Sequence, residues 1–269
     1  MDYYDQLAKH VLSRKEDSNR NEVFFAATVG SMNYGLDDEK SDCDCKIVLV
    51  PLMGQILKWT NEINREDKAS RSNDIVSQYD MRNYFLYLMK MNPNFIETLF
   101  ARAHYVNHKY QEEFDLLMNM RDEVAYCTPL SSIRTMRGIM KNEYQKLVCS
   151  HGEDSKAAYH CARIGFMLSD YYRGKDYGSC LLAANDTESI KKLMLSIKNG
   201  EKKPSYVLSF CDNMIKNEQT EYDFFVGGGG PKEYEKGYFL SDTEAGIEDI
   251  ETQVLLKSFA GRYKVVVDS

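Results

Sequence analysis

The chain has 269 residues, a length that predicts two closely packed domains. Its formal charge is −7, from 34 basic and 41 acidic residues, which argues against a protein that coats nucleic acid through bulk positive charge. No apolar stretch approaches the roughly 18 residues that cross a bilayer. The first 17 residues favour an amphipathic helix over a secretory signal, and the seven scattered cysteines indicate reduced thiols, so we expect a cytoplasmic protein without a membrane partner.

Apolar runs in the first half predict three buried strands. The first covers residues 23–29 (VFFAATV) and stops at Gly30. The second, 44–51 (DCKIVLVP), is rich in β-branched residues and ends at a proline, while the third, 74–79 (DIVSQY), alternates apolar and polar positions. Helices are expected between and after them, at 80–91, 94–101 and 110–121.

Two capping signals mark the starts of these helices. Asp80 is the expected N-cap of helix 80–91, and Asn92 with Pro93 breaks that helix. Asn94 and Glu97 form a capping-box pattern for the helix that follows, so we interpret both residues as structural.

Strand signals nearly vanish after residue 130. Helical spacing predicts helices at 131–149, 155–173, 187–199, 204–217 and 241–258. The GGGGP run at 227–231 is typical of a connector and not of a phosphate loop, because no strand precedes it and no Lys-Ser or Lys-Thr step follows. The predicted fold class is therefore α+β, with a mixed-sheet domain at 1–128 followed by a helical domain at 129–269.

The stretch GSMNYGLDDEKSDCDCKIVLVP, which follows the first strand, has the residues of a metal and phosphate site. Alternation along a strand places Asp42 and Asp44 on one face and their cysteine neighbours on the packed face. Two such carboxylates repel each other unless a hard cation lies between them, and Mg²⁺ prefers one or two carboxylates together with phosphate oxygens. The turn at Gly30 and Ser31 offers backbone N–H groups and a hydroxyl to a phosphate. The alternative is a polar turn before a strand, in which Ser and Asp are common.

These motifs, with YDMRNYFLYLMKMNPNFIETLF and KAAYHCAR further on, resemble the polymerase beta-like nucleotidyltransferases, and within them the RlaP/YcgL-type family associated with RNA repair. The resemblance covers most of residues 23–200 and implies a nucleotidyltransferase mixed-sheet domain. It implies that Asp42 and Asp44 bind divalent metal and that Gly30 and Ser31 hold the triphosphate. For the third carboxylate, Asp74 is our choice because it enters an alternating strand, with Asp80 as the alternative.

Lys156, His160 and Arg163 fall on one face of the predicted helix 155–173. A solvated face is the usual reason for such charges, but the resemblance extends through these positions and implies contact with nucleotide phosphates, with Arg163 as a bidentate ligand. A second group of basic residues lies on helix 131–149, where a solvated face is favoured over a guide for an acceptor strand. Its members are Arg134, Arg137, Lys141 and Lys146.

The resemblance thus implies a Mg²⁺- or Mn²⁺-dependent enzyme that transfers a nucleoside monophosphate from a triphosphate, with ATP expected, to an acceptor hydroxyl, with an RNA or tRNA end expected. The acceptor alternatives are a protein hydroxyl, as in AMPylation, and a second nucleotide, as in signal-nucleotide synthesis. A nucleotide-binding regulatory module with degenerate catalysis is a further alternative. Retention of two mutually repelling carboxylates argues against that last reading.

Overall fold

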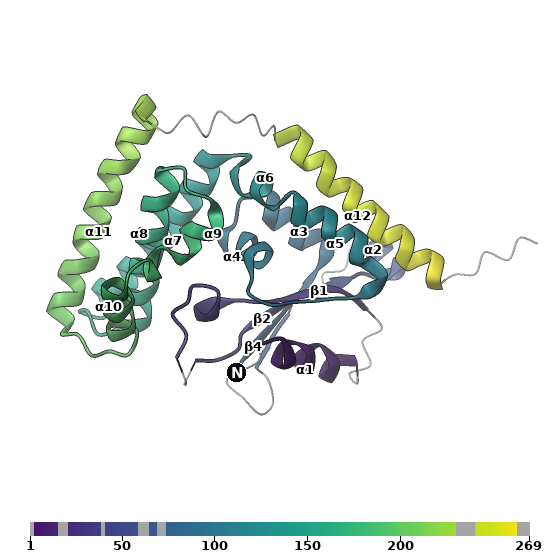
Figure 1. The fold of residues 1–269 in the computed structure, drawn as a ribbon, viewed down its shortest axis with the longest axis horizontal. Helices are drawn as coiled ribbons and strands as arrows, with labels where there is room; N and C mark the ends of the chain where they lie inside the picture. Colours follow the sequence, from purple (N-terminus) through teal and green to yellow (C-terminus); the bar gives the residue numbers. More distant parts are fainter. Residues whose placement is uncertain are drawn as a thin grey trace, which may run out of the picture.

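The computed structural model describes residues 3–15, 21–38, 41–58, 65–68, 74–229 and 240–262. Its centre is a five-stranded sheet in the order β3-β4-β2-β1-β5 (Figure 1). The strands are β1 (Glu22–Thr28), β2 (Cys45–Val50), β3 (Arg65–Lys68), β4 (Ile75–Asp80) and β5 (His104–Val106). The three strands expected from the sequence are present. The short edge strands β3 and β5 were not expected, because neither carries an apolar run.

Strand pairing brings the motifs of the sequence to one edge of the sheet. β1 and β2 are antiparallel, with Thr28 opposite Cys45, so the end of β1 meets the start of β2. β2 and β4 are parallel, with Cys45 opposite Val76, so the starts of these two strands also lie together. The residues that follow β1 and those that precede β2 and β4 therefore share one corner of the molecule.

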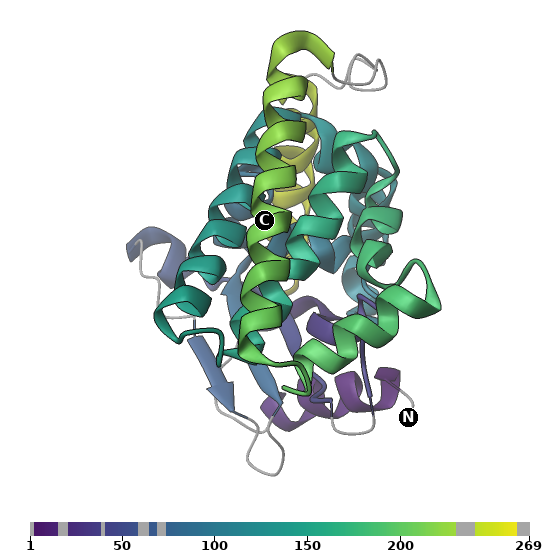
Figure 2. The same cartoon turned by 90° about the vertical axis from the view of Figure 1, so that its left-hand side faces the viewer.

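The two faces of the sheet pack against different layers. Helix α1 (Tyr3–Lys15) covers one face, where Leu7 and Val11 pack in a small cluster with Ile47 (Figures 1 and 2). The opposite face packs against α3 (Met81–Met89) and α12 (Leu240–Arg262), whose buried residues belong to the main core. A β-bulge between Val23 and Phe25 lets the consecutive Phe24 and Phe25 both enter the main core on that opposite side.

Between and after the strands, the first half contains several short helices. They are α2 (Met53–Lys58), α3 (Met81–Met89), α4 (Pro93–Ile96), α5 (Gln111–Asn119) and α6 (Arg121–Tyr126), with 3-10 turns η1 (Gly30–Met32), η2 (Glu97–Phe100) and η3 (His108–Tyr110). The helix expected at 94–101 is thus divided into α4 and η2. Its N-cap is Asn92, whose side chain accepts a hydrogen bond from the Asn94 N–H at 3.1 Å, so the predicted capping box of Asn94 and Glu97 is wrong.

The second half is helical, as predicted. It comprises α7 (Pro129–Cys149), α8 (Ser155–Tyr172), α9 (Tyr177–Leu182), η4 (Ala183–Asn185), α10 (Glu188–Lys198), α11 (Pro204–Phe224), the π-helical turn η5 (Phe225–Gly229) and α12 (Leu240–Arg262). Helix α8 is its centre and packs against α7, α9, α10 and α11. Gly230 and Pro231 of the predicted connector lie outside the described residues.

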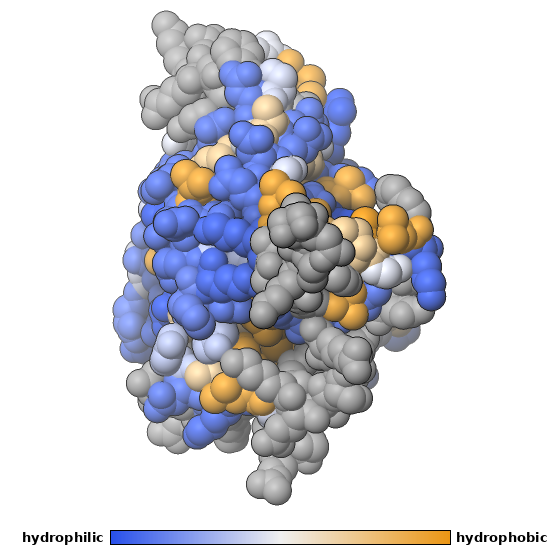
Figure 3. Space-filling view, turned by 90° about the vertical axis from the view of Figure 1, so that its right-hand side faces the viewer, coloured by the Kyte–Doolittle hydropathy of each residue, from blue (hydrophilic) through white to orange (hydrophobic). Residues whose placement is uncertain are grey.

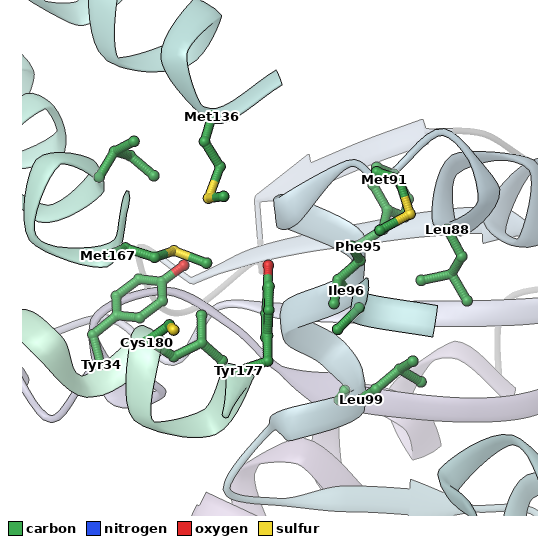
Figure 4. Close-up of a cluster of buried hydrophobic side chains, with 14 of the residues drawn as sticks. Tyr34, Leu88, Met91, Phe95, Ile96, Leu99, Met136, Met167, Tyr177 and Cys180 are labelled. Atoms are coloured by element: carbon green, nitrogen blue, oxygen red, sulfur yellow. The ribbon is translucent and has the colours of Figure 1, made fainter. Parts of the chain in front are cut away.

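The two halves share one hydrophobic core. Figure 4 shows Met136 of α7 and Met167 of α8 lying across from Phe95 and Ile96 of α4, with Tyr177 of α9 between them. The last helix, α12, returns to the first half and packs on α3 and α5 (Figure 1). The predicted α+β class is confirmed. Buried residues from both sides of residue 128 belong to one hydrophobic cluster, and the division into two domains at that residue stays a prediction.

Among the described residues, no helix is both long and apolar enough to span a membrane. The face at the end of the molecule where α2 and α12 lie is mainly hydrophilic, with hydrophobic patches between (Figure 3). The side chains of Leu57 in α2 and Leu256 in α12 are exposed to solvent.

Candidate active site

The Gly-Ser turn lies directly beside the second aspartate of the pair. The Val29 N–H donates to the Asp44 carbonyl at 2.9 Å, which extends the pairing of β1 with β2 by one step. Gly30 then opens the 3-10 turn η1 with φ +80°. A Cβ at Gly30 would stand 3.7 Å from Asp44 Oδ2, and the positive φ would strain any residue with a side chain. The turn and the carboxylate therefore form one small site.

The residues before β2 alternate between open and packed sides. Asp42 is exposed and Asp44 is half-buried, whereas Cys43 and Cys45 are buried. This is the pattern expected from the sequence, although the strand itself begins only at Cys45. The two aspartates are thus left on the side of the Gly-Ser turn.

The charge environment of Asp44 is crowded. Burial raises the pKa of the Asp44 carboxyl, and the nearby charges of Asp42 and Asp74 raise that pKa further. A hydrogen bond from the Ile75 N–H and the positive charge of Lys156 act in the opposite direction. A cation placed among these acids would relieve their mutual repulsion.

Asp74 is tied to this corner by a reciprocal pair of hydrogen bonds. The Cys43 N–H donates to Asp74 Oδ1 at 2.7 Å, and the Ile75 N–H donates to Asp44 Oδ1 at 2.7 Å. The second oxygen of Asp74 lies 3.0 Å from Nε2 of His10 on α1. Each aspartate therefore holds the backbone next to the other, which fixes the spacing between the starts of β2 and β4.

Asp80 lies at the opposite end of the same strand. It pairs in register with Leu49 and is fully buried. Its carboxylate caps α3 by accepting from the Arg82 N–H at 2.9 Å, and it also bonds the Arg82 guanidinium at 2.5 Å. Of the two candidates for the third carboxylate, the structure brings only Asp74 to the side of Asp44.

The start of α8 faces the carboxylates. Asp154 is the N-cap of α8 and accepts from the Ala157 N–H at 2.8 Å. Lys156 follows in the first turn, close enough for its charge to lower the pKa of Asp44. One turn later, burial and then the charges of Arg163 and Lys156 lower the pKa of His160 to about 4. His160 is therefore uncharged at neutral pH and can offer a hydrogen bond but no positive charge.

Arg163 is buried, which differs from the position expected of a bidentate phosphate ligand. Its side chain is 6% exposed, and the guanidinium lies 3.8 Å from the centroid of the Tyr34 ring. Among the described residues its Nε has no hydrogen-bond partner. The guanidinium thus packs beneath the loop that follows η1, at stacking distance from an aromatic face.

A buried ion pair that the sequence interpretation missed supports the same loop. Lys46 lies two residues after Asp44, and its Nζ is 3.2 Å from Glu97 Oε1. The Tyr34 hydroxyl donates to the other oxygen of Glu97. The signal was present in the sequence, because a lysine inside the buried run CKIVLV requires a buried acid. Glu97 had instead been interpreted as half of a capping box.

The predicted basic group on α7 does not form one surface. Arg137 is buried, and its Nε lies 2.6 Å from Glu218 on α11. Lys146 is paired with Glu143 on its own helix at 2.6 Å, while Arg134 and Lys141 are exposed. Arg134, Lys141 and Lys146 therefore agree with the solvated face that the sequence favoured, whereas the buried Arg137 does not.

The donor set fits a divalent cation that is shared with a substrate. In the part of the chain that the structure describes, no three His, Cys, Asp or Glu side chains gather closely enough to hold a metal ion by themselves. Asp42 and Asp44 can supply two carboxylates on the open side, and Mg²⁺ commonly takes its remaining ligands from phosphate oxygens and water. A triphosphate at the adjacent Gly-Ser turn would supply those oxygens.

A mixed sheet with a Gly-Ser turn after one strand and an Asp-x-Asp pair before its neighbour, followed by a helical region, is consistent with a polymerase beta-like nucleotidyltransferase. The family model described as RlaP, RNA repair pathway DNA polymerase beta family, matches residues 5–175. The chain therefore belongs to the RlaP family. A comparison with curated proteins finds no significant match.

Proposed function

We propose that the protein is a nucleotidyltransferase that uses Mg²⁺ or Mn²⁺ to transfer a nucleoside monophosphate from ATP to the hydroxyl at an RNA end, with a tRNA end as the expected acceptor. The observation that carries this proposal is the placement of Asp44, which lies against Gly30 while the charge of Lys156 acts on the same carboxylate. The family description favours RNA over the protein and nucleotide acceptors.

The chain's own residues have distinct roles in this proposal. Asp42 and Asp44 would hold the metal, which when bound neutralises charge on the phosphates. The N–H groups of the turn at Gly30 and Ser31 bind the triphosphate, and Lys156 balances the negative charge of the complex. The acceptor oxygen forms a bond to the α-phosphorus as the bond to the pyrophosphate oxygen breaks. Pyrophosphate leaves with the electron pair of the broken bond, and the proton of the hydroxyl passes to the third carboxylate, proposed as Asp74.

The remaining residues orient this site. Asp74 is the proposed third carboxylate, supported by its position beside Asp44 and oriented by the Cys43 N–H and His10. His160, uncharged at neutral pH, is available to hydrogen-bond a phosphate oxygen. We assign Arg163 the support of Tyr34 in place of direct phosphate contact, because its guanidinium is buried against that ring.

The test is transfer of label. The purified protein is incubated with each α-labelled nucleoside triphosphate, Mg²⁺ or Mn²⁺, and either total RNA, tRNA or protein. We expect label from ATP in RNA and none without the metal. Label in protein, or in a dinucleotide, would show that the acceptor is a protein hydroxyl, or a second nucleotide, and not RNA. Nucleotide binding without transfer to any acceptor would refute the enzyme and favour a regulatory module.

A further inference from the structure

Helix α10 reaches across to the loop that connects the Gly-Ser turn with Asp42. Its last residue, Lys198, places Nζ 3.1 Å from the Leu36 carbonyl and 2.8 Å from Ser41 Oγ. Asp38 Oδ2 lies 3.9 Å from the same nitrogen. An ammonium has three N–H donors, so Lys198 can donate to the Leu36 carbonyl and to Ser41 Oγ at once while its charge is paired with Asp38.

The two ends of this loop are also the two ends of the candidate site. Leu36 is tied back to the turn, since its N–H donates to the Ser31 carbonyl at 3.0 Å. Ser41 directly precedes Asp42 and exchanges hydrogen bonds with Asp38, whose N–H donates to Ser41 Oγ at 2.9 Å. Lys198 therefore links the phosphate-binding part of the site to its carboxylates through a single cation.

Other contacts seat the same loop on its surroundings. Gly35 has φ +65°, and a Cβ there would stand 2.2 Å from Nδ2 of Asn185 in η4. Asp37 is paired with Arg102 at 3.5 Å. Both Asn185 and Lys198 lie beyond the residues that the family model matches, which end at 175. Two of the contacts that hold the loop, those with Asn185 and Lys198, thus come from a part of the chain that the family match does not reach.

We propose that Lys198 is a positioning residue of the active site: it holds Leu36, Asp38 and Ser41 against the end of α10, so that Asp42 and Asp44 stand against the Gly-Ser turn before metal and nucleotide bind. This inference rests on the proposed function. A residue that orients metal ligands from outside the coordination shell typically changes metal affinity by roughly 10–100-fold when it is removed.

Lys198→Met tests the proposal because methionine keeps the length of the stem and removes the charge. Lys192→Met is the matched control, since Lys192 lies on the same helix in an exposed pair with Glu188. Lys198→Arg keeps the positive charge and should retain part of the Mn²⁺ affinity that Lys198→Met loses. If Lys198→Met does not fold, Ser41→Ala is measured in its place, because it removes the Ser41 hydroxyl that accepts from Lys198.

Two measurements are made on each full-length variant. Mn²⁺ binding, followed by electron paramagnetic resonance with a non-hydrolysable ATP analogue present, should weaken at least tenfold in Lys198→Met and stay unchanged in Lys192→Met. Amide hydrogen exchange at Asp38 and Ser41 should accelerate in the first variant alone, because their hydrogen bonds within the loop loosen.

The outcomes separate the inference from the function on which it rests. No Mn²⁺ binding by the unaltered protein would refute the proposed function. Binding by the unaltered protein together with equal affinity and equal loop exchange in both lysine variants would overturn the role of Lys198. Weaker binding of the ATP analogue without metal, with unchanged loop exchange, would also overturn it by making Lys198 a direct phosphate ligand.

Discussion

The buried pair of Lys46 and Glu97 predicts a large and specific loss of stability when only one charge is removed. In Glu97→Gln the shape is kept and an amide oxygen can still accept from Tyr34, but Lys46 loses its counter-charge. The side chain of Lys46 is 11% exposed and that of Glu97 is 5% exposed, so water can do little to replace the lost partner. Leaving such a charge buried and unpaired costs about 3 to 5 kcal/mol.

That cost is a large part of the roughly 5 to 15 kcal/mol by which a domain is usually stable. The double variant Lys46→Met/Glu97→Gln removes both charges and should recover most of the loss, because methionine fills the stem volume of lysine. The assay is urea unfolding of the unaltered protein, both single variants and the double variant, with the coupling free energy taken from the cycle. A loss below about 1 kcal/mol for Glu97→Gln, with an unchanged slope against urea, would refute the reasoning.

Asp44→Asn should reduce nucleotide transfer by at least about 10³-fold, or roughly 4 kcal/mol of transition-state stabilisation. It should not lower the stability of the fold, because the folded protein raises the pKa of this carboxyl and so disfavours its charge. Substantial residual Mg²⁺-dependent transfer would contradict the assignment of Asp44 as a metal ligand. Asp80→Ala should lower the free energy of unfolding by about 2 kcal/mol, because α3 loses its N-cap, and should leave the affinity for Mn²⁺ unchanged. Weaker Mn²⁺ binding would indicate that Asp80 is a metal ligand. The unfolded state should bind a proton at His160 between pH 6.5 and about 4 while the folded state does not. Stability should therefore fall as the pH drops through this window, by up to about 3 kcal/mol, and His160→Gln should fall by that much less in acid unfolding curves.

The first motif could be predicted from the sequence because its signals are local. Gly30, Ser31, Asp42 and Asp44 lie at the ends of two apolar runs, and the antiparallel pairing of those runs brings them together. The burial of Cys43 also follows from period-two alternation, which operates over neighbouring residues.

Contacts between distant segments could not be predicted in the same way. The choice between Asp74 and Asp80 depends on the parallel register of β2 and β4, which no local pattern specifies. Glu97 was misassigned because its spacing from Asn94 imitates a capping box, whereas its partner Lys46 lies 51 positions away. The helical spacing of Arg163 from Lys156 and His160 predicts a charge on the substrate side of the helix. The guanidinium is instead buried against Tyr34, a residue far away in the sequence, and no local pattern indicates that contact.

The return of α12 to the first half changes how the chain is divided. The elements that pack on the sheet are not continuous in sequence. Those before α7 form most of this sheet unit, α7 to α11 form the helical bundle, and α12 belongs to the sheet unit again. In the language of chain topology, α7 to α11 form an insertion and not a C-terminal appendage. Ending the chain before α7 would therefore strip the sheet unit of its last helix, whereas excising the insertion and rejoining its flanks would keep that helix. The bundle that carries Lys156 and Lys198 is flanked in sequence by the sheet unit on both sides and shares one hydrophobic core with it, so it is not joined to the carboxylates' half by a single linker, as an appended domain would be.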